Sequence, residues 1–333
     1  MGNNKIMVSV SVITYRHEKY IRQALDSILM QETDFRYEIV IGEDASPDST
    51  REILLEYKNR FPDIIKLILH KHNVGASRNS YEVRKHCSGK YIAILEGDDF
   101  WTDKNKLQKQ IDFLEQNPGF VGVAHNIYSV KSDGTNPVVV LKKSQVNREF
   151  RLQNYLNEGF SFHGNSLVHR NILPTSGERY EKLRFTVNTM GDIILYCLLL
   201  DKGSVFVMSD VMAAHRAASD EDISSYSFKQ RDRMIEFSYM YIKIVNALEE
   251  WFDGKYDLSP LIANRTAAVI FSFVFSEWRN RNIDKYEFRE YMISLSPQIR
   301  RQSYYKFIKR LTAKATNKVI SSAFGRGILY HEK

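Results

Sequence analysis

The stretch Gly89-Lys-Tyr-Ile-Ala-Ile-Leu-Glu-Gly-Asp-Asp99 indicates both the fold of this chain and its candidate site. Residues 91–95 form a short apolar run with the length and composition of a buried strand. The acidic cluster Glu96-Gly97-Asp98-Asp99 follows at once. Carboxylates this close together repel one another unless they share a cation or a proton. The cluster therefore predicts either a metal site or an acidic turn that caps the following helix, and the motif alone leaves both open.

Strand and helix signals alternate through the first third of the chain. Apolar runs predict further strands at residues 7–13, 37–41 and 64–69. Apolar side chains at helical spacing predict helices at residues 20–30, 77–86 and 103–116, and Ser46-Pro47-Asp48-Ser49 supplies one more helix start. This order of elements predicts an α/β fold with a sheet flanked by helices.

After residue 116 the strand and helix patterns of the sequence are shorter and less regular. Asp133-Gly134-Thr135-Asn136 lies between two apolar segments and predicts a hairpin. An apolar helix is expected at residues 192–200 and a strand at 204–208. From about residue 228 the sequence has few helix breakers, so a helical region is expected there. We place the boundary between the α/β domain and this helical region near residue 225.

Basic residues are concentrated at the end of the chain, which has a net charge of +7. From Arg300 onward nine lysines and arginines stand against one acid, Glu332, so the remainder is close to neutral. This distribution differs from that of a uniformly basic nucleic-acid binder, and no nucleic-acid partner is expected. Cys87 and Cys197 fit neither a disulfide framework nor a metal spacing, which favours a cytoplasmic location. No apolar stretch approaches the ~18–20 residues of a membrane-spanning helix.

Polar clusters follow three of the predicted strands at the edge where the strands end. They are Thr14-Tyr15-Arg16-His17, Gly42-Glu43-Asp44-Ala45-Ser46 and the acidic cluster. Ligands of open α/β sheets bind at the carboxyl ends of the strands. The chain has neither a GxGxxG turn after its first strand nor a GxxxxGK[ST] loop, so a bound diphosphate needs another source of positive charge. Acids that hold Mg²⁺ or Mn²⁺ supply it, and Glu43 and Asp44 favour this alternative over the acidic turn.

The first strand and helix, and the acids after the second strand, are similar to those of a known family. Val8-Ser-Val-Ser-Val-Ile-Thr-Tyr15, followed by Tyr20-Ile-Arg-Gln-Ala-Leu-Asp-Ser-Ile28, resembles the opening of family 2 glycosyltransferases of the GT-A fold. Glu43-Asp44-Ala45-Ser46 resembles that family's Asp-Asp-Gly-Ser segment, whose acids contact the nucleoside base. Glu43 stands where the pattern usually has Asp, and of the two acids we favour Asp44 as the one that reads the base.

Later motifs continue the resemblance in the same order. Asn73-Val74-Gly75 and Arg78-Asn79 match the family's Asn-x-Gly and Arg-Asn positions, and residues 89–99 match the strand that delivers its Asp-x-Asp motif. Each motif is weak alone, but their order and spacing make the resemblance specific over about residues 7–130 and looser over residues 160–220.

The resemblance implies a GT-A-type, Rossmann-like mixed sheet flanked by helices. It divides the chain into a catalytic domain at residues 1–225, with a nucleotide-binding half at 1–130 and an acceptor half at 131–225, and a helical C-terminal region with a basic tail at 226–333. It also implies an inverting transfer of a sugar from a nucleotide-diphosphate donor, with a UDP-sugar favoured, to a glycan or lipid-linked acceptor in bacterial surface polysaccharide synthesis.

The same resemblance implies roles for individual residues. The nucleotide-binding residues are expected to be Thr14, Tyr15, Glu43, Asp44, Arg78, Glu96, Asp98 and Arg216. Asp98 is expected to be the main ligand of Mn²⁺ or Mg²⁺, with Asp99 supporting it and Glu96 nearer the ribose. Glu96, like Glu43, stands where the family usually has Asp.

Three segments after residue 160 carry further candidate site residues. Met190-Gly191-Asp192 resembles the segment that supplies the general base, which predicts Asp192 as the catalytic residue; capping of its helix is the structural alternative. His215-Arg216 follows the predicted strand at 204–208, where Arg216 can neutralise the leaving diphosphate. His215 is a candidate metal ligand, although an isolated histidine is more often structural. Phe162-His163-Gly164-Asn165-Ser166 is expected to line the acceptor pocket.

Several alternatives remain open on the sequence alone. The basic, amphipathic segment that includes Tyr304 and Ile308 predicts either a helix on an anionic membrane surface, which would put the protein on the inner face of the membrane, or a helix packed on the catalytic domain with a solvated basic face. A nucleotidyltransferase would also use acids at strand ends, but it should carry a glycine-rich loop after the first strand. A non-catalytic, membrane-associated binding module is the third alternative, and the joint presence of Asp44, Asp98 and Asp192 argues against it.

Overall fold

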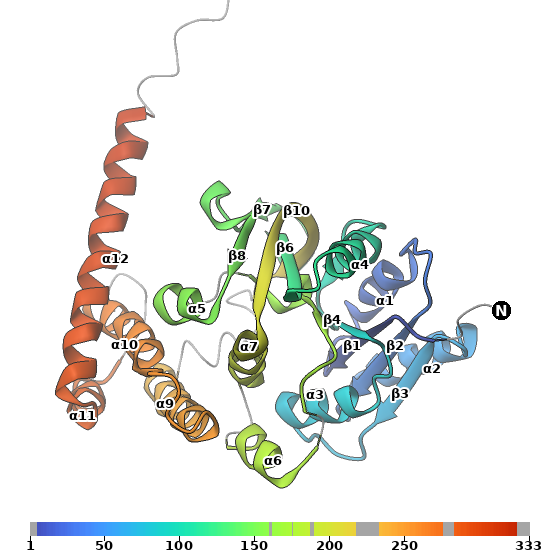
Figure 1. The fold of residues 1–333 in the computed structure, drawn as a ribbon, viewed down its shortest axis with the longest axis horizontal. Coiled ribbons are helices and arrows are strands. Elements are labelled where there is room, and N and C mark those ends of the chain that lie inside the picture. The colour runs from blue at the N-terminus through green and yellow to red at the C-terminus, as the bar shows by residue number, and fades with distance from the viewer. Residues whose placement is uncertain are drawn as a thin grey trace, which may run out of the picture. The chain divides into compact units, whose positions relative to one another are not determined.

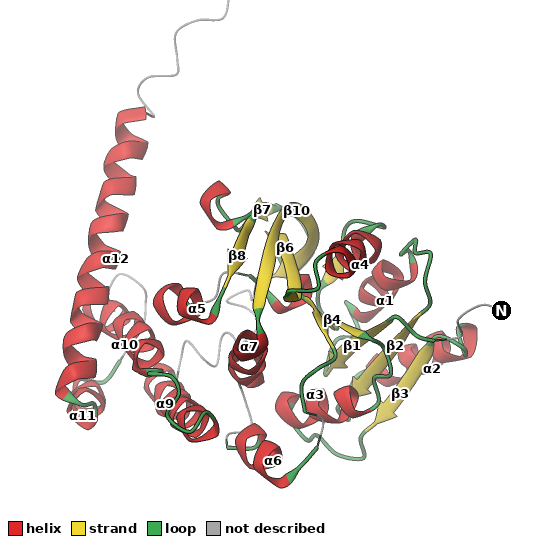
Figure 2. Ribbon diagram, in the orientation of Figure 1, coloured by secondary structure: helices red, strands yellow, loops and turns green. Residues whose placement is uncertain are grey.

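The computed structural model describes residues 5–159, 162–174, 176–186, 190–217, 233–275 and 283–324, with side chains up to residue 312. The chain forms two compact units, Met1–Phe228 and Lys229–Lys333. The predicted domain boundary near residue 225 lies outside the described residues. The first unit holds the sheet, and the second is helical (Figures 1 and 2).

The first unit is built on one mixed sheet. Ten strands are described: β1 Val8–Thr14, β2 Tyr37–Glu43, β3 Ile65–Leu69, β4 Tyr91–Glu96, β5 Phe100–Trp101, β6 Phe120–Val130, β7 Val138–Val139, β8 Arg148–Phe150, β9 Val168–Arg170 and β10 Ser204–Arg216. The main path runs β3-β2-β1-β4-β9-β6-β10-β5, with β7 on β6 and β8 on β10. The strands β3, β2, β1 and β4 are parallel to one another, and β9 runs antiparallel to both β4 and β6. The predicted mixed α/β sheet is confirmed.

Helices cover the strands on both sides. They are α1 Ile21–Leu29, α2 Thr50–Arg60, α3 Ala76–Lys85, α4 Lys106–Gln116, α5 Leu152–Glu158, α6 Glu178–Arg184 and α7 Gly191–Lys202, with short 3₁₀ turns η1 Lys143–Gln145 and η2 Gly164–Ser166. Apolar side chains of α1, α2 and α4 pack with the strands in one core, where burial of a leucine or isoleucine stabilises by about 1.5–3 kcal/mol. Helix α3 contacts β1 and β2, and Figure 1 shows it on the opposite side of these strands from α1.

Strand β10 is longer than the sequence predicts. The strand was expected to end at residue 208, with His215-Arg216 beyond it, but both residues belong to β10. The polar residues Ser209 and Asp210 interrupt the apolar pattern, and the pairing of β10 with β6 shifts register there, so the strand continues past an irregularity that the pattern does not show. The far end of β10 pairs with β5 through Ala214 and Phe100. This pairing brings the end of β10 beside the acidic cluster.

The second unit consists of helices in its described part, as predicted. They are α9 Met234–Trp251, α10 Ser259–Val274, α11 Lys285–Ser294 and α12 Pro297–Phe324. Its interior includes the fully buried Leu248 and Ala267, and the buried hydroxyls of Thr266 and Tyr291 lie 2.8 Å apart. None of the helices within the described ranges is both long and apolar enough to cross a membrane.

Candidate active site

The acidic cluster leaves β4 at the carboxyl edge of the sheet, between the ends of β1 and β10. Gly97 donates its backbone N–H to the Ile13 carbonyl at 3.0 Å, which ties the turn to β1. A Cβ at Gly97 would lie 2.7 Å from Thr14 Oγ1 and 2.8 Å from His17 Nδ1, so only glycine allows this close approach. The turn therefore presents the acids at the sheet edge, where ligands of such folds bind.

Asp99 is fully buried and fixed by groups that are distant in sequence. The side-chain amide of Asn165 in η2 donates to Asp99 Oδ2 at 2.8 Å, and the backbone N–H of Arg216 donates to Oδ1 at 3.0 Å. Trp101 Nε1 in turn donates to the Asn165 carbonyl at 3.1 Å. Asp99 is therefore held in one position by β10 and η2.

Two imidazoles complete a cluster around Asp99. His215 Nδ1 lies 3.2 Å from each Asp99 oxygen, and His163 Nδ1 lies 4.0 Å from Oδ2. The rings of His163 and His215 are 4.2 Å apart between centroids. One potential ligand atom from each of the three residues lies within 4.8 Å of the others. A carboxylate and two imidazoles in this arrangement are a candidate divalent-metal site.

The charges in this cluster are strongly coupled. Burial opposes the charge on Asp99, but the hydrogen bond and the positive charge of His215 leave the pKa of this carboxyl below its usual value. Burial likewise opposes protonation of His215, but Asp99 raises its pKa to about 9. Burial and the neighbouring His215 lower the pKa of His163 to about 4. The charge of Asp99 thus favours the protonated form of His215, whereas burial favours the neutral form of His163; a metal ion bound here would replace the His215 proton.

Asp98 points away from this cluster, toward β1. Its Oδ2 lies 3.9 Å from His17 Nε2, and its side chain is 34% exposed. His17 is oriented by Thr14, whose Oγ1 is 3.2 Å from His17 Nδ1. Burial raises the pKa of Asp98, and the nearby His17 counteracts this. Asp98, predicted as the main metal ligand, therefore lies outside the Asp-His-His group, and Asp99, predicted to support it, lies at the centre.

Glu96 and Asp192 are exposed carboxylates whose charges interact with each other. Desolvation by the surrounding protein, together with the charges of Asp98 and Asp99, raises the pKa of Glu96 to about 8. Desolvation also raises the pKa of Asp192, in the first turn of α7. Glu96 and Asp192 are thus exposed residues close enough to interact, and the pKa of each carboxyl is raised. Groups that exchange protons often have such shifted pKa values.

The two acids after β2 serve the loops around them. Asp44 accepts backbone N–H bonds from Val74 at 2.7 Å and from Gly75 at 2.9 Å, which fastens the loop after β3 to the end of β2. Burial raises the pKa of Asp44 in spite of these bonds. Glu43 is fully buried and forms an ion pair with Arg51. Both acids thus have structural partners, and the backbone around Asp44 is well fixed.

Three predicted nucleotide-binding residues lie in other surroundings. Arg78 is half-exposed on α3, where its Nε lies 3.1 Å from Glu82 Oε1. Tyr15 is 37% exposed. Arg216 is buried, and its guanidinium donates to the carbonyls of Asp98 and Ser132, to Gln23 Oε1, and stacks on two aromatic rings. The Arg216 guanidinium, predicted to neutralise the leaving diphosphate, is thus held by other side chains and carbonyls of the chain.

Sequence reasoning gave no role to His17 and placed His163 and Asn165 only in an acceptor segment. His17 belonged to a polar cluster at a strand end, which was the signal available for it. His163 had no signal in its local sequence, because its relation to Asp99 arises from the placement of η2 between β4, β6 and β10.

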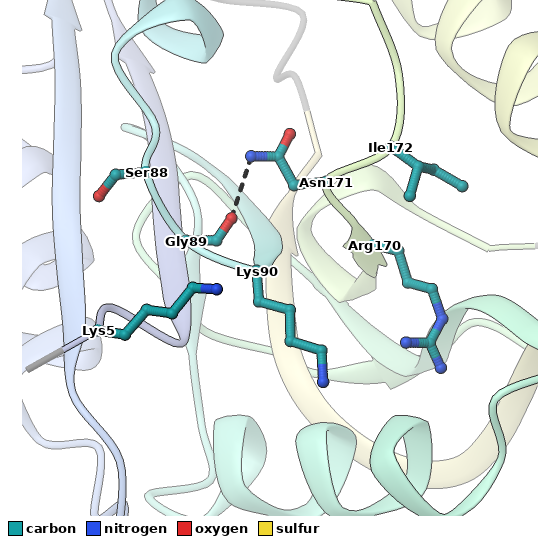
Figure 3. A pocket seen from close by; sticks show the side chains of 7 residues that line it. All are labelled: Lys5, Ser88, Gly89, Lys90, Arg170, Asn171 and Ile172. Atoms are coloured by element: carbon teal, nitrogen blue, oxygen red, sulfur yellow. Dashed lines mark hydrogen bonds between the residues drawn. The ribbon is translucent and has the colours of Figure 1, made fainter. Parts of the chain in front are cut away.

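A separate pocket lies at the opposite edge of the sheet, beside the starts of β1 and β4. Its volume is about 330 Å³, and Lys5, Lys90 and Arg170 give it a basic lining (Figure 3). The Lys90 ammonium pairs with Glu115 at 2.5 Å, and Arg170 donates to the Phe120 and Leu114 carbonyls. None of the predicted site residues lines this pocket.

The sequence pattern of Glycosyl transferase family 2 matches residues 9–176, which is half of the chain. The chain belongs to this family. The acidic cluster and the acids after β2 both lie within the matched segment, whereas α7 and the end of β10 lie beyond it.

Individual relatives agree with the family assignment. Putative teichuronic acid biosynthesis glycosyltransferase TuaG of Bacillus subtilis is 32% identical over 136 residues, 40% of this chain and 52% of its own length. UDP-Glc:alpha-D-GlcNAc-diphosphoundecaprenol beta-1,3-glucosyltransferase WfgD of Escherichia coli is 33% identical over 111 residues, 33% of this chain and 42% of its own. Uncharacterized protein Rv1520 of Mycobacterium tuberculosis is 39% identical over 127 residues, 38% of this chain and 37% of its own. The matches thus span about half, or less, of these relatives.

A solved structure shows the same fold over a longer stretch. S. aureus TarS 1-349 in complex with UDP superposes with a TM-score of 0.58 at 16% identity, covering 98% of this chain and 93% of that one. The same protein has been solved with UDP-GlcNAc, with a TM-score of 0.55 at 17% identity, covering 90% of this chain and 78% of that one. This likeness establishes the GT-A fold of the chain.

Proposed function

We propose that this family 2 glycosyltransferase transfers a sugar, with inversion, from a nucleotide-diphosphate donor to a glycan or lipid-linked acceptor. The observation that carries the proposal is the meeting of Asp99, His163 and His215 at the carboxyl edge of the sheet, with the exposed Glu96 and Asp192 close by. Membership of this family favours glycosyl transfer over the nucleotidyl transfer that the acids alone also allow.

The donor side is supported by the loops after β1, β2 and β4. Thr14 ends β1 and Tyr15 follows it, and Asp44 lies in a fixed loop. Glu96 and Asp98 are accessible at the end of β4. The fold neighbour TarS was solved with UDP and with UDP-GlcNAc, which supports a UDP-sugar as the donor proposed here. With a nucleotide sugar as donor, we propose a cytoplasmic location for the reaction.

The donor atoms of the Asp-His-His group fit a divalent metal ion, Mn²⁺ better than Mg²⁺, because Mg²⁺ prefers oxygen ligands alone. Asp99, His163 and His215 would hold it, and Asn165 already orients the carboxylate as supporting groups do in metal sites. When bound, such an ion neutralises the charge of the leaving diphosphate. Asp98 lies on the other side of the same turn, and its partly exposed carboxylate is accessible to the same metal ion or to the donor.

Asp192 is the proposed general base. An inverting transfer requires a group that takes the proton of the acceptor hydroxyl as this oxygen attacks the anomeric carbon. Asp192 is exposed, lies near Glu96 and has a raised pKa, so it can reach an acceptor and hold a proton. No carboxylate in the described part of α7 other than Asp192 lies at the start of that helix.

A lipid-linked acceptor is proposed from two further features. The E. coli relative is named for an acceptor carried on diphosphoundecaprenol. On α12, the exposed side chains of Tyr304, Tyr305 and Ile308 lie among basic residues, and the helix contains no Asp or Glu. Aromatic and basic side chains on one surface favour contact with an anionic membrane. We therefore place the protein on the inner membrane face.

The proposal is tested by a donor screen on the full chain. Calorimetry with a panel of nucleotide sugars should give binding of a UDP-sugar that is strengthened by Mn²⁺. Asp192→Asn should retain this binding while turnover falls by roughly 10²–10⁴-fold, the usual contribution of a general base. The matched control is Asp201→Asn at the other end of α7. Absence of any nucleotide binding with Mn²⁺, or full turnover by Asp192→Asn, would contradict the proposal.

A further inference from the structure

Arg184, at the end of α6, is a buried cation beneath the start of α7. Only 4% of its surface is exposed. Its Nη1 donates to the Gly191 carbonyl at 2.9 Å, and its Nη2 donates to Ser80 Oγ at 3.1 Å and more weakly to the Ser77 carbonyl at 3.4 Å. The guanidinium thus joins the first residue of α7 to α3, an element that packs on β1 and β2.

The backbone that leads into α7 is shaped around this arginine. A Cβ on Gly191 would lie 2.2 Å from Arg184 Nη1, so a side chain at this position would displace the guanidinium. Met190, the residue before it, has a left-handed backbone with φ of 56°, an unusual conformation for a residue with a side chain. Such strain persists only where surrounding contacts hold it. Here the hydrogen bond from Arg184 supplies a contact directly at the turn that aims Asp192.

The positive charge of Arg184 interacts with the Asp192 carboxylate. Among the described carboxylates, none forms an ion pair with Arg184, and its Nε has no hydrogen-bond partner. Burial and the neighbouring charge of Arg84 lower the pKa of Arg184, and Tyr180 and the charge of Asp192 counteract this. The positive charge of Arg184 and the N-terminus of α7 both favour the ionised form of Asp192.

The other titratable groups near Asp192 carry negative charge or none. Glu96, at the end of β4, adds negative charge, and burial keeps the Tyr196 hydroxyl and the Cys197 thiol of α7 neutral by raising the pKa of each. Within the described part of the chain, Arg184 is the cation that interacts with Asp192. The backbone N–H groups of Asp192 and Ile193 and the charge of Arg184 thus together favour the ionised form of Asp192, against the effect of burial.

We propose that Arg184 is a positioning residue of the transfer reaction, which aims Asp192 and keeps it ionised until it takes the acceptor proton. This inference rests on the proposed function of Asp192 as the base. In that step the Asp192 carboxylate takes the hydroxyl proton, the acceptor oxygen bonds to the anomeric carbon, and the bond from that carbon to the diphosphate breaks with its electron pair on the phosphate oxygen.

The test compares pH profiles of kcat for the full-length wild type and two neutral variants, Arg184→Met and Arg184→Gln. Both variants should move the acidic limb of kcat to higher pH, and each unit of movement lowers kcat on that limb by about tenfold. Activity should recover at high pH, and the donor KM should stay unchanged. Arg184→Gln retains an N–H donor for Gly191, so it keeps the test decisive if Arg184→Met does not fold.

Two controls separate a positioning role from a structural one. Arg184→Lys keeps the charge and should leave the limb close to that of the wild type. Arg84→Met removes another buried arginine from the contact between α3 and α6, where Arg84 donates to Tyr180 Oη at 3.1 Å, and should leave the limb in place. A loss of kcat that is equal at every pH in both neutral variants, or no change at all, would overturn the role of Arg184.

The outcome for Asp192 distinguishes this inference from the function on which it rests. If Asp192→Asn is inactive and the Arg184 variants do not shift the limb, the base assignment stands and the role of Arg184 is wrong. If Asp192→Asn has full activity, the proposed base is wrong, and the role of Arg184 is overturned with it.

Discussion

Lys106, the first residue of α4, should make the stability of this protein depend on pH. Its side chain is fully buried. Its Nζ donates to Gln110 Oε1 at 2.7 Å and lies 4.1 Å from the centre of the Trp101 ring, and none of the described carboxylates forms an ion pair with it. Burial lowers the pKa of Lys106 well below its usual value. The folded protein should therefore hold this amine in its neutral form.

The sign of the effect follows from proton counting. Above the folded pKa of Lys106 and below its unfolded pKa of about 10.4, the unfolded chain carries a proton that the folded chain lacks. The free energy of unfolding of the wild type should then rise with pH, by about 1.4 kcal/mol per pH unit for this one proton. Lys106→Met lacks this proton and should not show that increase.

The measured quantity is the difference in unfolding free energy between the wild type and Lys106→Met, from urea denaturation at pH 7.5, 8.5 and 9.5. Over this range the difference should grow in favour of the wild type by about 1.4 kcal/mol for each pH unit that lies above the folded pKa of Lys106. The variant also leaves Gln110 Oε1 without its donor, which costs about 1–3 kcal/mol at every pH. That loss shifts the difference without changing its slope.

The control is Lys104→Met, since Lys104 is exposed and, among the residues that the structure describes, its one ion pair is with the exposed Glu32. Its difference from the wild type should be small and level across the same pH range. A level difference for Lys106→Met as well would refute the reasoning, because it would mean that Lys106 stays protonated in the folded protein.

Three further outcomes are expected from the same structure. Asp99→Asn should weaken Mn²⁺ binding, measured by calorimetry, by roughly 10-fold or more, because it removes the central charge of the metal cluster. Gly42→Ala should destabilise the protein by about 1–3 kcal/mol in urea denaturation, because its Cβ would lie 1.9 Å from Asn79 Oδ1. Tyr305→Ala combined with Ile308→Ala should reduce sedimentation of the full chain with anionic vesicles and leave donor turnover in solution unchanged; equal sedimentation would contradict a membrane role for α12.

The nucleotide-binding half of the fold was predictable because its signals are local. The strands β1, β2 and β4 are short apolar runs, buried almost throughout, and each ends in polar residues that mark the sheet edge. The helix α1 buries one apolar stripe at helical spacing. Both kinds of pattern depend only on which side chains face the core, so they can be recognised without knowing how the strands pair.

The candidate metal site at Asp99, His163 and His215 was not predictable in the same way, because its members meet through pairing over long distances in the sequence. The strand β9 has three residues and lies antiparallel between β4 and β6, and nothing in its length or composition specifies that place. The far end of β10 reaches Asp99 only because the strand continues through an irregularity and pairs with β5. The sequence therefore predicts acids at this edge with Asp98 as the main metal ligand, whereas the Asp-His-His group in the structure is centred on Asp99.

The two adjacent acids differ because the backbone turn sends them to opposite sides. Asp99 faces inward, where Asn165 and the Arg216 backbone fix both of its oxygens before any ligand arrives. Asp98 faces His17 and keeps a third of its side chain exposed. A metal ligand has to be held by supporting groups, whereas a group that contacts a substrate has to be accessible. Arg216 contacts both acids: its backbone N–H donates to the Asp99 carboxylate, and its guanidinium donates to the Asp98 carbonyl. The buried Arg216 therefore helps to fix the turn that carries Asp98 and Asp99.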